Sequence, residues 1–376
     1  MIFLDYASTT PIDQDVLNSY WEILNRYYAN SASNHQLGLE VDSLQNQARN
    51  QIANILKVKM DEIIFTSGSS ESNNFAIKGV AFKYKNRGKH IITSSIEHKS
   101  VLECFKQLEK EFGFEVTYLE PNEDGKITIE ALEKSIRKDT ILVSIMYVNN
   151  EIGTINPIPE IGKFLSDKPT IIFHCDATQA IGKIPVDLNN VDLVSISAHK
   201  IYGLKGSGIL VKKKNIELLP LIAGGGQEYG YRSGTSNWPV NVMFAKTLRL
   251  AFDSQRDNYN HVLKLKEKII DHLQGIENIQ INTPAENASP YIINFSIKNK
   301  KAAVIAQAFD DHGVCLSTIS ACSTKTEMPS HVIYETFKDI KRAESSIRVS
   351  MSKYTTFEEI TKFLMVLDEI MVSIKG

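Results

Sequence analysis

The 376-residue sequence is poor in cysteine, and its four cysteines do not show the pair spacing of a zinc site. They therefore predict no metal centre, and they fit a reduced compartment. Long apolar runs are also absent. No stretch reaches about 18 uninterrupted apolar residues, and residues 1–5 are not a basic region followed by an apolar helix. The sequence thus predicts neither export nor a membrane-spanning segment, and the expected location is cytoplasmic.

An excess of charge of one sign is missing as well. The chain has 42 Lys and Arg residues against 44 Asp and Glu residues, which gives a net charge of −2 and no electrostatic reason to expect nucleic-acid binding. We interpret the basic run 212–214 as a solvated strand end. With 43% apolar and 23% charged residues, the composition is typical of a soluble globular protein. A chain of this length can bury a sizeable core in two or more domains.

What the sequence does contain is an alternation of helical and extended patterns. Apolar residues recur at steps of three and four over 41–55, which predicts an amphipathic helix. After the glycines 224–226 the pattern becomes a long helical stretch, 239–273, which we interpret as the bridge to a smaller domain with a strand at 291–296 and a terminal helix at 356–374. Before it, seven apolar runs predict the strands of a large, mostly parallel α/β sheet: 63–66, 91–93, 116–119, 141–145, 171–175, 193–197 and 209–211.

Lys200 is the first candidate catalytic residue, because it follows the apolar run 191–196 at a predicted strand end. An amine that is desolvated near hydroxyl and imidazole groups can have a lowered pKa, as a lysine that forms a Schiff base with pyridoxal phosphate requires. Asp176 ends the preceding strand, and parallel strands present their carboxyl ends at one edge of a sheet. Such enzymes need a carboxylate against the pyridinium nitrogen, because protonation makes the ring an electron sink. Taken alone, Lys200 is better explained as a surface lysine that caps an element, and Asp176 is explained equally well as a helix cap.

Three further predicted strand ends carry polar groups suited to the same ligand. The Gly/Ser turn with Ser69 and Ser70 leads into a predicted helical stretch, 75–85, and its N–H and hydroxyl groups suit a phosphate. It is not a Walker loop, because no Gly-Lys-Ser/Thr follows. His98 and Asn150 each follow another strand, where an imidazole could lie on the cofactor ring and move protons. Each of these features alone also has a plain structural explanation, as a helix cap or a loop residue.

Together and in this order, these motifs resemble the cysteine desulfurases of NifS/IscS type, within the class V aminotransferase group. Matching stretches run from residues 3–11 to residues 346–350. The resemblance implies fold type I of the pyridoxal-phosphate-dependent transferases, with a large, mostly parallel seven-stranded sheet domain and a smaller α+β C-terminal domain. It also implies an N-terminal segment, 1–15, that packs toward the small domain, a large domain over 16–255, a small domain over 256–376, and a homodimer that completes each site.

The resemblance also implies a role for each candidate residue. Lys200 would carry pyridoxal 5'-phosphate, Asp176 would pair with the pyridinium nitrogen, and His98 would stack on the ring and serve in acid/base steps. Gln179 and Asn150 would reach the ring hydroxyl. The phosphate would be held by the remaining cofactor-binding residues: Ser69, Ser70, Ser197, His199 and, from a neighbouring subunit, Thr235.

Two further residues concern the substrate. By resemblance Arg348 would bind the carboxylate of L-cysteine beside Asn150, and Cys322 in Ser-Ala-Cys-Ser would attack the substrate sulfur, become a persulfide and leave alanine. A thiolate is the reactive form of cysteine, and a flexible, polar loop would let it be exposed and deprotonated. Ile319 departs from the family, which usually has Gly there, and a β-branched residue restricts the backbone. We interpret the other cysteines as packing groups on a helix or a strand: Cys104, Cys175 and Cys315.

The leading hypothesis is a pyridoxal-phosphate-dependent L-cysteine desulfurase that passes sulfur to an iron–sulfur scaffold or to a protein that thiolates tRNA or a cofactor. A selenocysteine lyase or a cysteine-sulfinate lyase would share every cofactor residue without needing Cys322, and another class V aminotransferase would share the fold. A non-catalytic binding subunit is the alternative from a different class. Against it stands the joint presence of Lys200, Asp176, His98 and Arg348.

Overall fold

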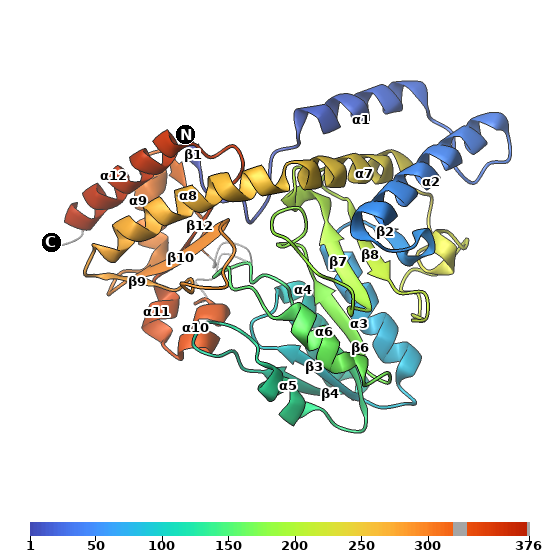
Figure 1. The fold of residues 1–376 in the computed structure, drawn as a ribbon, viewed down its shortest axis with the longest axis horizontal. Coiled ribbons are helices and arrows are strands. Elements are labelled where there is room, and N and C mark those ends of the chain that lie inside the picture. Colours follow the sequence, from blue (N-terminus) through green and yellow to red (C-terminus); the bar gives the residue numbers. More distant parts are fainter. Residues whose placement is uncertain (319–328, 374–376) are drawn as a thin grey trace.

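The protein is described by a computed structural model over residues 1–318 and 329–373. Its largest element is a seven-stranded sheet made of β2 (Ile63–Thr66), β3 (His90–Ser94), β4 (Glu115–Leu119), β5 (Thr140–Ser144), β6 (Ile172–Asp176), β7 (Leu193–Ser197) and β8 (Gly208–Lys212). The strand order is β2-β8-β7-β6-β5-β3-β4 (Figure 1). Neighbours among β3 to β7 are parallel, and β8 is antiparallel to both β2 and β7. The predicted mostly parallel, seven-stranded α/β sheet is therefore confirmed.

Helices cover both faces of this sheet because its strands are apolar on both sides. Consecutive residues such as Ile63 and Ile64 belong to opposite hydrophobic clusters, as the two-residue period of a strand requires. One cluster includes residues of α3 (Ser69–Tyr84) and α4 (Lys99–Phe112). The other cluster includes residues of four further helices: α2 (Gln36–Leu56), α5 (Ile129–Ser135), α6 (Ile158–Ser166) and α7 (Trp238–Asp253).

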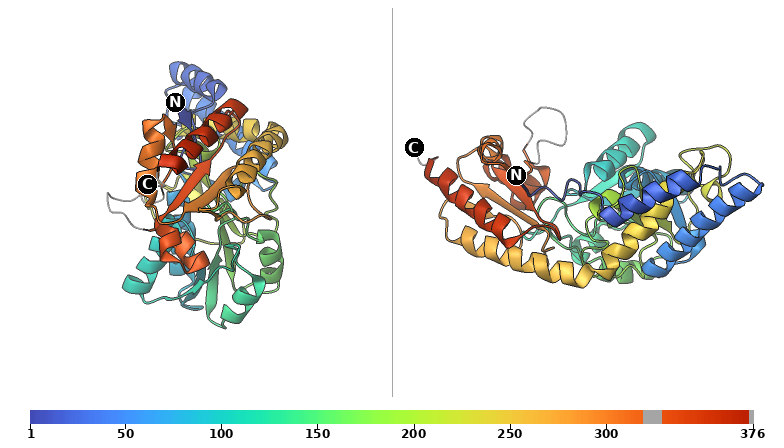
Figure 2. Two further views of the ribbon diagram at one scale, coloured as in Figure 1. Left: turned by 90° about the vertical axis from the view of Figure 1, so that its left-hand side faces the viewer. Right: turned by 90° about the horizontal axis from the view of Figure 1, so that it is seen from above.

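A second, antiparallel sheet with the order β12-β10-β9 lies toward the C-terminal end of the chain. It consists of β9 (Ile279–Ile281), β10 (Ile292–Ile297) and β12 (Ser346–Ser350), packed with α8 (Gln255–Gln274), α9 (Ala302–Asp311) and α12 (Phe357–Ser373). Figure 2 shows α7 and α8 running along one side of both sheets. Short β1 (Ile2–Phe3) pairs in parallel with β11 (Val314–Cys315) in a separate two-stranded sheet, and Ile2 and Leu4 join the hydrophobic cluster of the second sheet. The domain boundaries at residues 15 and 255 stay a prediction.

The remaining elements are short or lie on the periphery. They are α1 (Gln14–Arg26), α10 (His331–Phe337), α11 (Ile340–Glu344) and the 3-10 turns η1 (Met60–Glu62), η2 (Ala198–Lys200) and η3 (Glu228–Gly230). Within the described part of the chain, none of the helices combines the length and the apolar character that crossing a membrane requires.

Three predictions about individual segments need correction. The helix that follows the Gly/Ser turn begins at Ser69 rather than at Phe75, because its first turn is polar and shows no apolar period. The stretch 239–273 is two helices that meet at Ser254, where the hydroxyl donates to Leu250 O at 2.8 Å and the backbone leaves the helical conformation. The interpretation of Lys212 as solvated is wrong. Its ammonium is buried, donates to Ile216 O at 2.7 Å and lies over the Tyr231 ring.

Candidate active site

The candidate residues converge at the carboxyl edge of the parallel strands. Asp176 is the last residue of β6, and Lys200 ends η2 directly after the neighbouring parallel strand β7. His98 follows β3 and caps α4. This is the edge at which open parallel sheets bind their ligands.

Asp176 is buried, and each of its oxygens accepts a hydrogen bond. Oδ2 accepts from Asn73 Nδ2 at 2.7 Å, and Oδ1 accepts from the backbone N–H of Thr178 at 3.0 Å. Both donors are neutral, so the carboxylate is held in place while its charge remains uncompensated. Asn73 was not among the residues predicted from the sequence. The one feature of the sequence that could have indicated it is its spacing. Asn73 lies three residues after Ser70 and four after Ser69, which puts it on the same face of α3.

The ring of His98 is held by the start of its own helix. Its Nδ1 accepts from the backbone N–H of Ser100 at 3.1 Å and lies 2.8 Å from Ser100 Oγ. Ser100 Oγ accepts from Asn73 Nδ2 at 2.9 Å, which leaves the hydroxyl hydrogen for His98 Nδ1. The neutral ring therefore carries its hydrogen on Nε2. Although the side chain is exposed, desolvation by the surrounding protein lowers the pKa of His98, and the charge of Lys200 acts in the same direction.

Lys200 contacts the N-terminal segment. Its Nζ donates to Ala7 O and to Ser8 O, both at 2.6 Å. Ala7 O also accepts from Gln179 Nε2 at 2.9 Å, so one carbonyl joins the candidate Schiff-base lysine to the candidate ring-hydroxyl ligand. The segment 7–10 thus closes one side of the site.

The candidate phosphate site lies between the start of α3 and the end of β7. Gly68 precedes α3 with φ +149°, no side chain caps the helix, and a Cβ on Gly68 would lie 3.5 Å from Ser197 Oγ. A Cβ on Gly208 of β8 would lie only 2.5 Å from Gly68 Cα, so this close approach requires glycine. His199 follows Ser197, and burial lowers the pKa of His199 to about 4. The uncapped N–H groups of Ser69 and Ser70 and the Ser197 hydroxyl together suit a phosphate.

Arg348 on β12 brings a buried guanidinium to the same place. Its Nη1 donates to the backbone oxygen of Asn150 at 2.9 Å, and its Nη2 donates to Asp5 Oδ1 and Ser8 Oγ, each at 2.8 Å. Its Nε is buried and has no hydrogen-bond partner among the described residues. A buried N–H of this kind is costly unless a ligand satisfies it, and a carboxylate is the group that fits.

Whether pyridoxal phosphate fits the site can be judged from the buried polar atoms that have no hydrogen-bond partner. Asn73 Oδ1, Thr178 Oγ1 and Arg348 Nε are all in this state, and all belong to residues that surround Asp176 or the N-terminal segment. The site also holds one carboxylate for a pyridinium, one lysine for an aldehyde and an uncapped helix for a phosphate. These groups are complementary to pyridoxal phosphate at each of its three functional ends.

One predicted site residue is not joined to the others within the described part of the chain, and another lies outside that part. Thr235 is exposed on the segment between η3 and α7, and no contact in the described part of the chain links it to the residues above. Cys322, like Ile319, lies outside the described residues.

Burial raises the pKa of Cys104 to about 12 and that of Cys175 well above its usual value, which agrees with their interpretation as packing groups. Cys315 is half-buried on β11.

Glu97, directly before His98, is a buried carboxyl group that was not predicted from the sequence. Its Oε1 accepts from Ser94 Oγ at 2.7 Å and from the backbone N–H of Met146 at 2.9 Å, while Oε2 has no partner within the described chain. Burial raises the pKa of Glu97 from 4.5 to about 8. Glu97 is therefore protonated at neutral pH in the folded protein and ionised in the unfolded chain.

We expect Glu97→Gln to stabilise the protein at pH 8 and to have little effect at pH 5. The unfolded chain loses this proton above its ordinary pKa of 4.5, so the wild-type contribution to stability is full below that pH and is lost as pH rises toward about 8. Glutamine keeps the Oε1 acceptor without a titrating proton, and the gain at pH 8 should be roughly 1–3 kcal/mol. Thermal unfolding at both pH values measures it, with Glu62→Gln as a control for a carboxylate that accepts two backbone N–H groups. A variant that follows the wild type at both pH values would contradict the assignment.

Comparison with known proteins agrees with this geometry. The family model for class-V aminotransferases matches residues 2–363. The cysteine desulfurase IscS of Dictyoglomus turgidum is 42% identical over 377 residues, covering 100% of this chain and 95% of its own length. A solved NifS-like protein superimposes with a TM-score of 0.92 at 37% identity, with 99% of each chain covered. A solved structure described as SspA in complex with cysteine has a TM-score of 0.83 at 36% identity and covers 95% of this chain and 100% of its own.

These similarities span the whole chain rather than one motif, and they confirm the resemblance that the sequence motifs indicated, the fold type and the pyridoxal phosphate cofactor. The chain belongs to the class-V aminotransferase family and, within it, to the pyridoxal-phosphate-dependent cysteine desulfurases of IscS/NifS type.

Proposed function

We propose that this protein converts L-cysteine to L-alanine at the carboxyl edge of the large sheet and passes the sulfur to an acceptor protein. The observation that carries the proposal is the meeting of Lys200 and Asp176 on adjacent strand ends with the buried guanidinium of Arg348. The similarity to a solved protein in complex with cysteine supports the substrate. Bound pyridoxal phosphate supplies an electron sink for the carbon atoms of the substrate.

The residues of this chain position the substrate and move its protons. Arg348 binds the substrate carboxylate through the free Nε, and its contacts with Asp5 and Asn150 keep the guanidinium fixed before the substrate arrives. Lys200 holds the cofactor and exchanges protons with the substrate carbon. His98 presents Nε2–H to the site, since its Nδ1 is occupied by Ser100, so in its neutral form it donates a hydrogen bond there.

Cys322 would take the sulfur. Its thiolate attacks the sulfur of the substrate, an S–S bond forms, and the C–S bond breaks. The electron pair of the C–S bond stays with the carbon, which takes up a proton and leaves as alanine. A thiol on the acceptor protein can then attack the outer sulfur of the persulfide and release the thiolate of Cys322.

Surface features support the proposed partners. Leu17, Trp21 and Leu24 are exposed at helical spacing on α1, and Tyr28 follows them with 86% of its surface exposed, which fits a helix face covered in a homodimer. In Figure 1, α1 lies at the outer edge of the molecule, away from the second sheet. In a dimer the exposed Thr235 would reach the phosphate in the other subunit. An iron–sulfur scaffold or a thiolation enzyme is the proposed acceptor, and the cytoplasmic location stays a prediction.

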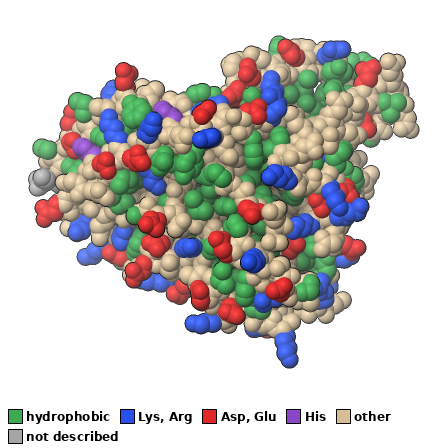
Figure 3. Space-filling model, viewed as in Figure 1, with side chains coloured by type: hydrophobic (Ala, Val, Ile, Leu, Met, Phe, Trp, Pro, Cys, Tyr) green, Lys and Arg blue, Asp and Glu red, His purple; other side chains and the backbone are tan. Residues whose placement is uncertain are grey.

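A nucleic acid is not proposed as a direct partner. On the face shown in Figure 3, basic and acidic side chains are interspersed rather than gathered in a large area of one sign. The net charge of −2 agrees with that distribution.

Product analysis tests the proposed function. The pyridoxal-phosphate-loaded protein, given L-cysteine and a reductant, is expected to yield alanine and sulfide in equal amounts. Formation of a keto acid instead of alanine would indicate an aminotransferase. Alanine from selenocysteine or cysteine sulfinate but not from cysteine would indicate one of the lyases, and the absence of a visible band from bound cofactor would contradict an enzymatic role.

A further inference from the structure

Lys183 is a buried lysine that the proposed reaction does not use. It follows β6 by a short turn, and its Nζ donates to Gln179 Oε1 at 2.7 Å. No carboxylate among the described residues lies within ion-pair distance of this Nζ, so the ammonium is compensated by an amide oxygen rather than by an opposite charge. Isolated buried ammonium groups are costly, and the cost points to a function.

The contact sets the orientation of the Gln179 side chain. An ammonium group can only donate, so only Oε1 of the amide can face Lys183. Nε2 must then point the other way, where one of its hydrogens is donated to Ala7 O. The second hydrogen of Nε2 is left for the site. Ala7 O favours the same orientation, and the ammonium adds a charge that polarises the amide and strengthens its N–H donors.

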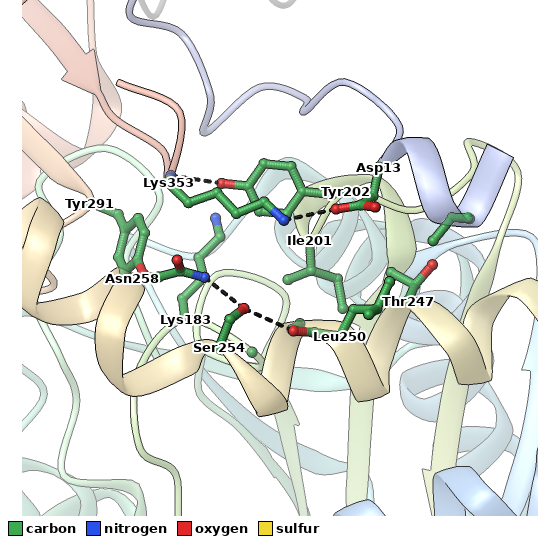
Figure 4. A pocket seen from close by; sticks show the side chains of 13 residues that line it. Asp13, Lys183, Ile201, Tyr202, Thr247, Leu250, Ser254, Asn258, Tyr291 and Lys353 are labelled. Atoms are coloured by element: carbon green, nitrogen blue, oxygen red, sulfur yellow. Dashed lines mark hydrogen bonds and ion pairs between the residues drawn. The ribbon is translucent and has the colours of Figure 1, made fainter. Parts of the chain in front are cut away.

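The groups that face Lys183 do not neutralise it. Figure 4 shows Lys183 at a small cavity beneath the N-terminal segment, together with Asp13, Tyr202, Tyr291 and Lys353. Asp13 is already paired with Lys353 at 2.8 Å. Burial raises the pKa of Tyr202 to about 12 and raises that of Tyr291 as well, so both phenols stay neutral.

The charges that act on Lys183 are positive. Burial lowers the pKa of Lys183 to about 7, and the charges of Lys200 and Arg348 act in the same direction. The free protein therefore keeps Lys183 close to the point of losing its proton. An anion that enters the site, such as a ring oxygen or a substrate carboxylate, favours the protonated form.

We propose that Lys183 is a positioning residue that orients and polarises the Gln179 amide, so that Gln179 presents an N–H donor to the ring oxygen of bound pyridoxal phosphate. The inference rests on the proposed function, because it takes Gln179 as the ligand of that oxygen. A donor at this place stabilises negative charge on the ring oxygen. Lys183 thereby tunes the protonation of the cofactor without contacting it.

The expected result is a shift in the pH titration of the visible absorbance of the resting holoenzyme, measured without substrate. Lys183→Met removes the charge and frees the amide oxygen, so the form with a protonated ring system should persist to higher pH, by about one pH unit. Lys183→Arg keeps a permanent charge and should return the midpoint toward the wild-type value. Lys183→Gln, which keeps a polar donor without the charge, is a second neutral variant in case the methionine variant does not fold.

Two controls separate this role from a structural one. Lys266 is also buried, donates to Ser289 O at 3.2 Å, and belongs to the C-terminal part of the chain, so Lys266→Met tests the loss of a buried lysine alone and should leave the midpoint unchanged. In a Gln179→Leu background, Lys183→Met should shift the midpoint by much less than in the wild type. A full shift in that background, or no shift in the neutral variants, would overturn the inference. A wild-type protein with no visible band would instead contradict the proposed function.

Discussion

Cys322→Ser is expected to reduce the formation of alanine and sulfide from L-cysteine by at least about a thousandfold, while the protein still binds pyridoxal phosphate. A serine hydroxyl is not ionised at neutral pH and is a poor nucleophile toward sulfur, whereas a cysteine thiolate attacks it readily. The loss should appear in the rate constant for turnover rather than in cofactor content. Product analysis and the visible spectrum of the same preparation measure both quantities.

Cys315→Ser is the matched control for this prediction. Cys315 lies seven positions earlier, is half-buried on β11 and has no proposed role, so its substitution should leave turnover near the wild-type rate. If Cys322→Ser were as active as Cys315→Ser, Cys322 would be a bystander. A lyase mechanism that needs no persulfide would then replace the desulfurase mechanism.

Asp176→Asn is expected to cause the second large loss. The carboxylate is proposed to face the pyridinium nitrogen, and two opposite charges about 4 Å apart at an effective dielectric constant of 20 attract each other by roughly 4 kcal/mol. Losing that attraction should lower turnover by about a thousandfold, since each 1.36 kcal/mol is a factor of ten in rate. The Michaelis constant for L-cysteine should change much less, because Arg348 still binds the substrate carboxylate. Steady-state kinetics with saturating cofactor separate the two effects.

Asp192→Asn serves as the control for a half-buried carboxylate outside the site. Asp192 Oδ2 accepts from the backbone N–H of Phe173 at 2.9 Å beside the same sheet, and the variant should keep its turnover even if it loses some stability. Equal activity of the two asparagine variants would remove Asp176 from the catalytic machinery. The turnover of an Asn73→Ala variant should lie between those of the two asparagine variants, since the substitution removes one of the two donors that hold Asp176.

The local sequence pattern was sufficient to predict the bounds of an element where apolar residues define that element. The strand runs 63–66 and 193–197 were predicted with the bounds that the structure shows. A short run of consecutive buried residues between polar residues has few alternatives to a buried strand. The start of α3 was predicted too late, since the first turn is Ser-Ser-Glu-Ser and is stabilised by its position at the sheet edge rather than by apolar periodicity. Lys212 was misread because the ring that covers it, Tyr231, comes from a distant segment.

The sequence by itself determined the succession of strands along the chain, the placement of Lys200 and Asp176 at strand ends, and the family, because these depend on residues that are neighbours along the chain. Only the tertiary structure decided which side chains hold those residues in place. Asn73 reaches Asp176 across 103 positions, and Asp5 reaches Arg348 across 343. The free energy of such contacts depends on packing between separate elements, and no local pattern encodes the distance between two groups that the chain brings together only when it folds.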